Sequence, residues 1–268
     1  MQAEATHGVG PVVLSGCADS SHDLQSSSVL VVMNSSMTMG PSGADHKVAV
    51  KRLLFSGLTH QPDFRAQRQQ VLMEAELNAG LAHPNLVATY AYRFAPLTHS
   101  NEVATDWVLL LVCELCSCGS LSNAIPLGSL QRLKGLSQGL SQGLSQLWDS
   151  QLQQPRVPQV LTVLGDVAHG MAYLHSRNIM HRDLKPDNVL LQDSPEGVVA
   201  KVADLGLGAV LRWQQTHLSN AYAGTPLYMA PEVQQQERSS LAGDVYSFGV
   251  LAWELLHGCT VWARLQQM

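Results

Sequence analysis

The sequence predicts an α+β fold in which strands come first and helices follow. Apolar, strand-like runs lie in the first half of the chain, at residues 29–33, 48–54 and 103–115. Helical spacing of three and four residues is clearest at residues 160–176, and residues 244–257 are apolar nearly all round, which predicts a buried helix. With 268 residues and 46% hydrophobic content, the chain can bury a sizeable core in one large domain or two lobes.

Residue composition predicts the structure of the remaining segments. Residues 1–28 are rich in small residues without periodicity and are expected to be irregular or disordered. Good helix formers fill residues 64–81 and predict a helix there. The apolar runs 189–191 and 201–203 flank the turn sequence at residues 193–197, which predicts a hairpin.

Residues 126–157 differ from the rest of the chain because Gly-Leu-Ser-Gln occurs three times in succession at 135–146. A period of four residues is too short for a solenoid unit, and each Gly costs about 1 kcal/mol inside a helix. We therefore interpret the segment as a low-complexity surface insertion. A docking role for it is an open alternative.

Charge, cysteine content and hydropathy narrow the functional classes. A net charge of −5 gives no reason to expect a nucleic-acid partner. Five cysteines without framework spacing favour a reduced, cytoplasmic setting, with a nuclear location left open. No apolar run approaches the roughly 20 residues of a membrane span, and the N-terminus lacks a secretory pattern.

The most informative motif is His-Arg-Asp-Leu-Lys-Pro-Asp-Asn at residues 181–188. It sets a carboxylate, an ammonium and a carboxamide at Asp183, Lys185 and Asn188. An aspartate can orient and deprotonate a hydroxyl, a lysine can neutralise charge on a moving phosphoryl group, and an asparagine oxygen can bind Mg²⁺. The spacing therefore suits phosphoryl transfer.

Three further motifs occur in a fixed order around this one. They are Val-Ala-Val-Lys at 48–51, Asp-Leu-Gly at 204–206 and Ala-Pro-Glu at 230–232. With them, residues 46–260 resemble a eukaryotic protein kinase domain. The sequence Lys-Pro-Asp at 185–187 is similar to that of serine/threonine kinases, and the helix from Asp244 resembles the tyrosine-kinase-like group.

The resemblance implies a bilobal fold and a substrate class. A small antiparallel β-sheet N-lobe with one main helix is expected at residues 29–115, and a mostly helical C-lobe at residues 116–268. The expected reaction transfers the γ-phosphoryl group of ATP, with Mg²⁺, to Ser or Thr hydroxyls of proteins. The alternative is a pseudokinase that acts as an interaction module.

The resemblance also implies a role for each residue of the catalytic motif. Asp183 is the expected catalytic base, and Lys185 stabilises charge on the phosphoryl group. Asn188 and Asp204 are the expected metal ligands. Thr225 is expected to touch both Asp183 and Lys185.

Nucleotide binding is carried over in the same way. The expected ATP-binding residues are Lys51, Ala49, Glu114, Cys116, Leu190 and Asp204. Lys51 should pair with a glutamate of the following helix, and counting back from His83 favours Glu74, with Glu76 as the alternative. A C-x-x-C-x-C pattern at residues 113–118 also suits a metal, but the sequence offers no further Cys or His cluster to complete the set.

Regulation by an upstream kinase is a further expectation. In the family, an arginine at the position of Arg182 often pairs with a phosphorylated residue between Asp204 and Glu232. The candidate targets in this chain are Thr216, Ser219 and Tyr222.

The chain departs from the family pattern at four places, one of which is Leu205, where the family usually has Phe. No G-x-G-x-x-G loop precedes Val48, although such a loop lets backbone N–H groups approach phosphates. Asn78 stands where an apolar residue is expected and would weaken the local packing unless it finds a hydrogen bond. The family expects further helices after residue 257, including an arginine that pairs with Glu232, so a truncated C-lobe of marginal stability is expected.

Overall fold

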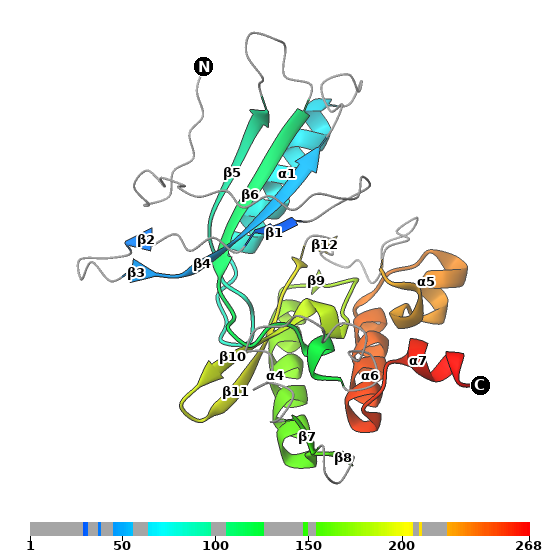
Figure 1. Cartoon of the computed structure of the whole chain (residues 1–268). Coiled ribbons are helices and arrows are strands. Elements are labelled where there is room, and N and C mark those ends of the chain that lie inside the picture. Colours follow the sequence, from blue (N-terminus) through cyan, green and yellow to red (C-terminus); the bar gives the residue numbers. More distant parts are fainter. Residues whose placement is uncertain are drawn as a thin grey trace. The chain divides into compact units, whose positions relative to one another are not determined.

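The computed structural model describes residues 29–31, 37–38, 45–55, 64–97, 106–125, 147–149, 154–205, 209–210 and 224–268 (Figure 1). The chain divides into two compact units. Unit 1 runs to Ala82 and resumes at Ala88–Leu115, and unit 2 comprises His83–Val87 and Cys116–Met268. The segment upstream of Val29 and the three candidate phosphorylation sites lie outside the described residues.

A four-stranded antiparallel sheet forms the body of unit 1. Its spatial order is β1 (Val29–Val31), β4 (Val48–Phe55), β6 (Asp106–Glu114) and β5 (Thr89–Leu97), and β2 (Met37–Thr38) pairs separately with β3 (Asp45–His46). The sequence analysis did not predict β5. Its signal was present, since Thr, Tyr and Phe, which favour strands, recur through residues 89–94.

Helix α1 (Phe64–Ala79) packs on one face of this sheet (Figure 1). Ala75 lies in a buried cluster with Leu109 and Leu111, and Leu53 packs against the same cluster. Side chains alternate between the two faces of a strand. Lys51 is two residues from Leu53, so it belongs to the face that α1 covers.

Unit 2 is built mainly from helices. The long helices are α4 (Val157–Ser176) and α6 (Leu241–His257), and the short ones are α5 (Pro231–Gln236) and α7 (Val261–Gln266), with 3₁₀ turns η2 (Leu121–Ala124), η3 (Pro186–Asn188) and η5 (Pro226–Tyr228). The strands pair as β10 (Val189–Ser194) with β11 (Gly197–Val202), β9 (Ile179–Met180) with β12 (Ala209–Val210), and β7 (Trp148–Asp149) with β8 (Gln154–Pro155).

Helix α4 confirms the predicted apolar spacing. All six positions identified from the sequence are buried: Val160, Val163, Leu164, Val167, Met171 and Leu174. The helix begins at Val157, three residues before the predicted start, because a proline in its first turn is compatible with helical geometry. Hairpin β7–β8 and this first residue fall inside the segment interpreted as an insertion, and Leu147 there is buried.

The prediction that α6 is buried all round is wrong. The helix turns one face, which includes Leu251 and Leu255, into unit 2, where it contacts α4 and η5. On its other side Val245 and Tyr246 are 62% and 44% exposed, and Leu256 is 40% exposed. Apolar residues occur on both faces of α6, so composition alone could not separate the buried face from the exposed one. Across the described residues, no helix combines the length and apolarity that crossing a bilayer requires.

Candidate active site

The loop at residues 181–188 joins β9 to β10 and is anchored to α6 by one buried carboxylate. Asp244, only 2% exposed, accepts hydrogen bonds from the backbone N–H of His181 at 2.9 Å and of Arg182 at 2.8 Å. It also lies 2.8 Å from Nε2 of His175. Arg182 adopts a left-handed φ of 71°, a conformation that costs on the order of 1–3 kcal/mol. The bonds to Asp244 hold the loop in this strained shape.

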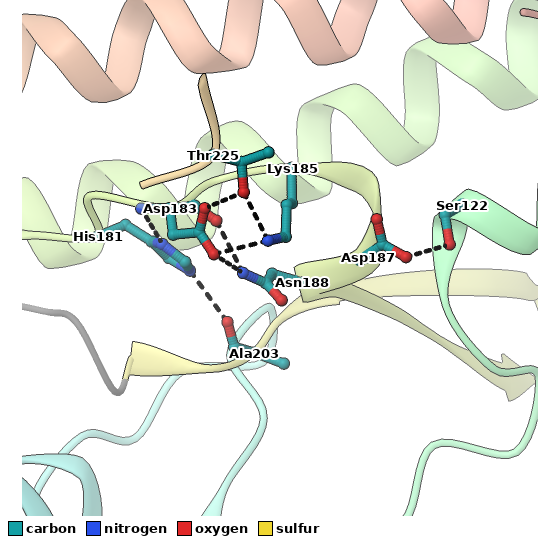
Figure 2. Close-up of polar contacts among 8 residues, drawn as sticks. All are labelled: Ser122, His181, Asp183, Lys185, Asp187, Asn188, Ala203 and Thr225. Atoms are coloured by element: carbon teal, nitrogen blue, oxygen red, sulfur yellow. Dashed lines mark hydrogen bonds and ion pairs between the residues drawn. The ribbon is translucent and has the colours of Figure 1, made fainter. Parts of the chain in front are cut away.

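His181 connects the loop to the strand that leads to Asp204 (Figure 2). Its ring is fully buried, and Nε2 lies 2.9 Å from the carbonyl oxygen of Ala203. Nδ1 accepts a hydrogen bond from the backbone N–H of Asp183 at 3.3 Å. A carbonyl only accepts, so Nε2 carries the proton. The ring thus ties the backbone at Asp183 to the backbone beside Asp204.

Asp183 is held by three donors (Figure 2). Its Oδ2 accepts from Nδ2 of Asn188 at 3.0 Å and lies 2.8 Å from Nζ of Lys185, while Oδ1 accepts from Oγ1 of Thr225 at 2.7 Å. An ionised carboxylate offers about four acceptor positions, two on each oxygen. Oδ2 is therefore saturated, whereas Oδ1 keeps one position at which a substrate hydroxyl can donate.

Thr225 makes both contacts expected of it. Its hydroxyl donates to Asp183 and accepts from Nζ of Lys185 at 2.7 Å. The preceding residue has to be glycine, because a Cβ on Gly224 would lie 2.5 Å from the carbonyl oxygen of Arg182, and its φ of 121° is unfavourable for other residues. Gly224 therefore lets the segment with Thr225 approach the catalytic loop.

Asn188 and Asp204, the expected metal ligands, lie on connected backbone segments. The Asn188 amide donates to the Asp183 backbone carbonyl at 2.8 Å as well as to its carboxylate, and Figure 2 shows its side-chain oxygen facing away from Asp183. The backbone carbonyl of Asn188 accepts a hydrogen bond from the backbone N–H of Ala203 at 2.8 Å. This bond holds the backbone next to Asp204 beside Asn188. Asp204 itself is exposed and has a left-handed φ of 60°. Two oxygen ligands of this kind suit a hard cation such as Mg²⁺.

The predicted nucleotide-binding residues are divided between the two units. Unit 1 contains Ala49, Lys51, Glu74 and Glu114, and unit 2 contains Cys116, Leu190 and Asp204. Within unit 1, Ala49 is buried opposite Cys113, and Glu114 accepts from the N–H of Ala88 at 3.3 Å. Within unit 2, Leu190 pairs with Ser120, which ties the segment after Cys116 to β10.

One open point of the sequence is answered within unit 1. The Asn78 amide donates to the backbone carbonyl of Glu74 at 3.0 Å, so the polar side chain does find a hydrogen bond. Cys113, Cys116 and Cys118 are free thiols. No cluster of three or more potential metal-binding His, Cys, Asp or Glu residues occurs in the part of the chain that the structure describes.

A second buried acid was missed by the sequence analysis. Glu254 is 1% exposed and accepts from the Tyr228 hydroxyl, at 2.8 and 3.0 Å, and from the N–H of Val261 at 2.7 Å. Burial raises the pKa of Glu254, although these hydrogen bonds oppose the shift. Burial and then the Glu254 charge raise the pKa of Tyr228, so the phenol stays a donor.

Together with Ser247, which donates to the Tyr228 carbonyl at 2.7 Å, Glu254 fixes the segment that follows Thr225 onto α6. Asp244 was equally unassigned as an anchor. The signal for both acids is the same. Each is an isolated carboxylate in a predicted apolar helix, and a buried carboxylate needs hydrogen-bond donors from elsewhere in the fold.

An aspartate that keeps a free acceptor position beside a lysine–threonine pair has the arrangement that phosphoryl transfer requires. The fold around it is α+β, with an antiparallel sheet in unit 1 and helices in unit 2, as the sequence predicts. The chain belongs to the protein tyrosine and serine/threonine kinase family, whose family model matches residues 19–267.

Individual relatives agree with this assignment. The chain is 33% identical over 191 residues to the mouse inhibitor of nuclear factor kappa-B kinase subunit beta, covering 71% of the chain and 22% of that protein. It is 35% identical over 209 residues to an Arabidopsis thaliana protein named LEAF RUST 10 disease-resistance locus receptor-like protein kinase-like 1.3, covering 78% and 25%. A probable LRR receptor-like serine/threonine-protein kinase of the same plant is 33% identical over 221 residues, covering 81% and 16%. The chain thus spans a quarter or less of these relatives' lengths.

Proposed function

We propose that this chain transfers the γ-phosphoryl group of ATP to Ser or Thr hydroxyls of protein substrates. The observation that carries the proposal is the Asp183 carboxylate, which is held by Lys185, Asn188 and Thr225 and keeps one acceptor position on Oδ1. Membership in the family supports ATP as donor and protein as acceptor. A relative named as a serine/threonine-protein kinase supports the choice of hydroxyl.

The reaction follows from the contacts of these side chains. A substrate hydroxyl donates to Oδ1 of Asp183, its oxygen forms a bond to the γ-phosphorus, and the bond from that phosphorus to ADP breaks. The hydroxyl proton passes to Asp183. The Lys185 ammonium, positioned by Thr225, stabilises the negative charge of the phosphoryl oxygens during transfer. Mg²⁺, held by Asn188 and Asp204, would supply charge neutralisation on the phosphates.

The roles proposed for the nucleotide-binding residues follow the same family. Lys51, paired with Glu74, would contact the α- and β-phosphates. Ala49 and Leu190 would enclose the purine, and the backbone at Glu114 and Cys116 would face its edge. The position of Lys51 on the sheet face covered by α1 supports its pairing with a glutamate of that helix.

Regulation and location are further parts of the proposal. Phosphorylation of Thr216, Ser219 or Tyr222 by an upstream kinase would supply an anion for Arg182. A cytoplasmic location fits the cysteine content of the chain and its kinship with a kinase subunit named for an inhibitor of nuclear factor kappa-B. Kinship with receptor-like kinases keeps a membrane-attached parent protein as the competing possibility.

Phosphoamino-acid analysis tests the proposed function. The chain is incubated with γ-³²P-labelled ATP, MgCl₂ and a basic protein such as histone H1, and the labelled product is hydrolysed. We expect label on phosphoserine and phosphothreonine, and about 10²–10⁴-fold less with Asp183→Asn, because a positioned base contributes this much. Label confined to phosphotyrosine, or equal label with the variant, contradicts the proposal.

The second candidate, a pseudokinase, is favoured by one observation. No G-x-G-x-x-G precedes Val48 in the sequence, so the usual backbone cradle for phosphates is missing. Calorimetric titration with Mg-ATP, together with the labelling assay on the same sample, separates the two candidates. A pseudokinase binds the nucleotide, or fails to bind it, without labelling any substrate, whereas the proposed kinase binds it and labels Ser or Thr.

A further inference from the structure

A group of basic and aromatic side chains on unit 2 takes no part in the contacts of Asp183. We call it the His83 cluster; it consists of His83, His169, Tyr173, Arg177 and Lys201. Three of these residues are spaced four apart on α4 and at its C-terminal end, so they lie on one face of the helix. The other two come from the segment before Asn85 and from β11. His169 and Arg177 are exposed, and the other three are partly exposed.

Tyr173 is the centre of the cluster. The guanidinium carbon of Arg177 lies 3.9 Å from the centroid of its ring, and the His83 ring lies 4.9 Å from it at an interplanar angle of 35°. Stacking on an aromatic ring orients a guanidinium while its N–H groups stay available for hydrogen bonds. The cation is thus presented in a defined position.

The segment that carries His83 is rigidly attached to α4 and β11. The N–H of Asn85 donates to Nδ1 of His83 at 3.1 Å, and the buried Asn85 amide donates to the Ala200 carbonyl at 3.2 Å. A Cβ on Gly170 would lie 2.6 Å from the Asn85 carbonyl oxygen, so α4 reaches this segment only because residue 170 is glycine. With Nδ1 accepting, Nε2–H is the donor that the neutral His83 ring offers to a ligand.

The surroundings of His83 favour its neutral form. Burial lowers the pKa of His83, and the charges of His169, Arg177 and Lys201 lower it further. The nearest acid on α4 is Asp166, whose Oδ2 already accepts from the N–H of Ala200 at 2.9 Å. Neither His169 nor Arg177 forms an ion pair with any residue that the structure describes. Arg177 is therefore an exposed cation beside two histidines, in a chain of net charge −5.

Helix architecture explains only part of this arrangement. A cation at the C-terminal end of a helix is favourable, which accounts for Arg177 at the end of α4. The same effect falls off within the last turn, so it does not account for His169, which lies two turns earlier. Nor does it account for His83 and Lys201, which come from other elements. A bound anion would offset the charge of Arg177 and would favour the protonated form of His83.

We propose that the His83 cluster is a docking site for an acidic peptide segment of a partner protein. From residue 169 to residue 177 the helix face spans about 12 Å at 1.5 Å per residue. An extended peptide covers that length with about four residues, so alternate Asp or Glu side chains reach successive cations. The guanidinium of Arg177 and the Nε2–H of His83 can donate hydrogen bonds to carboxylates. The Tyr173 ring offers apolar surface to the aliphatic part of the Asp or Glu side chains.

Fluorescence anisotropy with a labelled hexaglutamate peptide tests this proposal. We expect binding that weakens as salt is raised, and that is about fivefold weaker or worse when Arg177→Gln and Lys201→Gln are combined. The matched control is Arg264→Gln, which removes an exposed arginine of α7 and should leave binding unchanged. Thermal unfolding of each variant shows whether the fold is retained.

The titration of His83 gives a second, independent readout. An anion near His83 favours its charged form, so hexaglutamate should raise the pKa of His83 in an NMR titration, by about half a unit or more. By linkage the peptide should bind more tightly near pH 6 than near pH 8. Gly170→Ala should weaken binding without removing a charge, because it displaces the His83 segment.

Three results overturn the proposal. One is equal binding by the parent chain and the double variant with both folded, together with an unchanged His83 titration. Another is equal binding of hexalysine, which would mean that charge does not select the ligand. The third is displacement of the labelled peptide by inorganic phosphate at the same concentration of anionic groups as unlabelled hexaglutamate requires. This result would mean that the site binds small anions rather than a peptide. Phosphate transfer to histone H1 serves as a separate measure, because the cluster shares no residue with the catalytic contacts.

Discussion

The catalytic loop and helix α6 use their acidic side chains in opposite ways. Asp183 in the loop is 13% exposed at its side chain and keeps an acceptor position for a ligand. Asp244 and Glu254 on α6 are 2% and 1% exposed, and donors of the protein itself use each of them: three groups reach Asp244, and two reach Glu254. The same functional group is therefore reactive in one place and structural in the other, and the difference lies in which donors reach it.

The comparison predicts that changes near Asp183 act on rate, whereas changes on α6 act on stability. Lys185→Met should have the largest effect, a fall in kcat of roughly 10²–10³, because it removes the cation beside Asp183 and the donor to Thr225. Steady-state kinetics with histone H1 measure it, and Arg264→Met is the control on an exposed site. An unaltered kcat would place the transferring phosphoryl group elsewhere.

Asp244→Asn tests the structural side of the comparison. The variant keeps the shape of the side chain, but it places an NH₂ group where donors bond a carboxylate oxygen in the parent chain. Because at least one of these hydrogen bonds is lost, the free energy of unfolding should fall by about 2–3 kcal/mol. Urea unfolding followed by circular dichroism measures the change. A stability equal to that of the parent chain, with full activity, would show that Asp244 does not hold the loop.

Thr225→Val sharpens the boundary between the two regions, since Thr225 links them. Losing the hydroxyl while keeping the volume should reduce kcat about tenfold, because Asp183 and Lys185 each lose one hydrogen bond. Thr225→Ser restores the hydroxyl and should recover most of the rate. If serine and valine behave alike, packing rather than the hydroxyl determines the effect.

The smallest expected effect is a change in the pH dependence of stability. The pKa of Glu254 is raised by folding, so its favourable contribution is complete below the unfolded pKa and is lost as pH rises through the folded pKa. Glu254→Gln is neutral throughout and should remove this slope. Unfolding free energies of parent and variant, measured from about pH 4 to pH 8, give the difference directly. Parallel curves would mean that folding leaves this titration unaltered.

Tyr228→Phe refines the same test. The Tyr228 hydrogen bond lowers the pKa of Glu254, so its removal should raise that pKa further and extend the slope to higher pH. A shift of the slope to lower pH would contradict the assigned direction.

The sequence predicts the proposed catalytic loop because the chemistry of that loop is local. Asp183, Lys185 and Asn188 lie within six residues, so their spacing alone suggests phosphoryl transfer. Thr225 is more than forty residues away in the chain and entered only through the family resemblance.

The long-range anchors could not be found in the same way. The partners of Glu254, for example, are a phenol 26 residues before it and a backbone N–H seven residues after it. No local pattern marks such a pair, since the hydrogen bonds exist only after the helices have packed. Strand β5 and the exposed face of α6 were missed for a related reason. Whether one face or both faces of a helix or strand are buried depends on its neighbours in space. The sequence shows only which of its residues are apolar.

The central claim is that Asp183 accepts the proton of the substrate hydroxyl. It is tested most directly by measuring Mg-ATP binding and the rate of phosphoryl transfer on the same samples of the parent chain and Asp183→Asn. The account predicts nearly equal nucleotide affinity and a transfer rate lower by about 10²–10⁴ in the variant. A variant that transfers phosphate at the rate of the parent chain would contradict it.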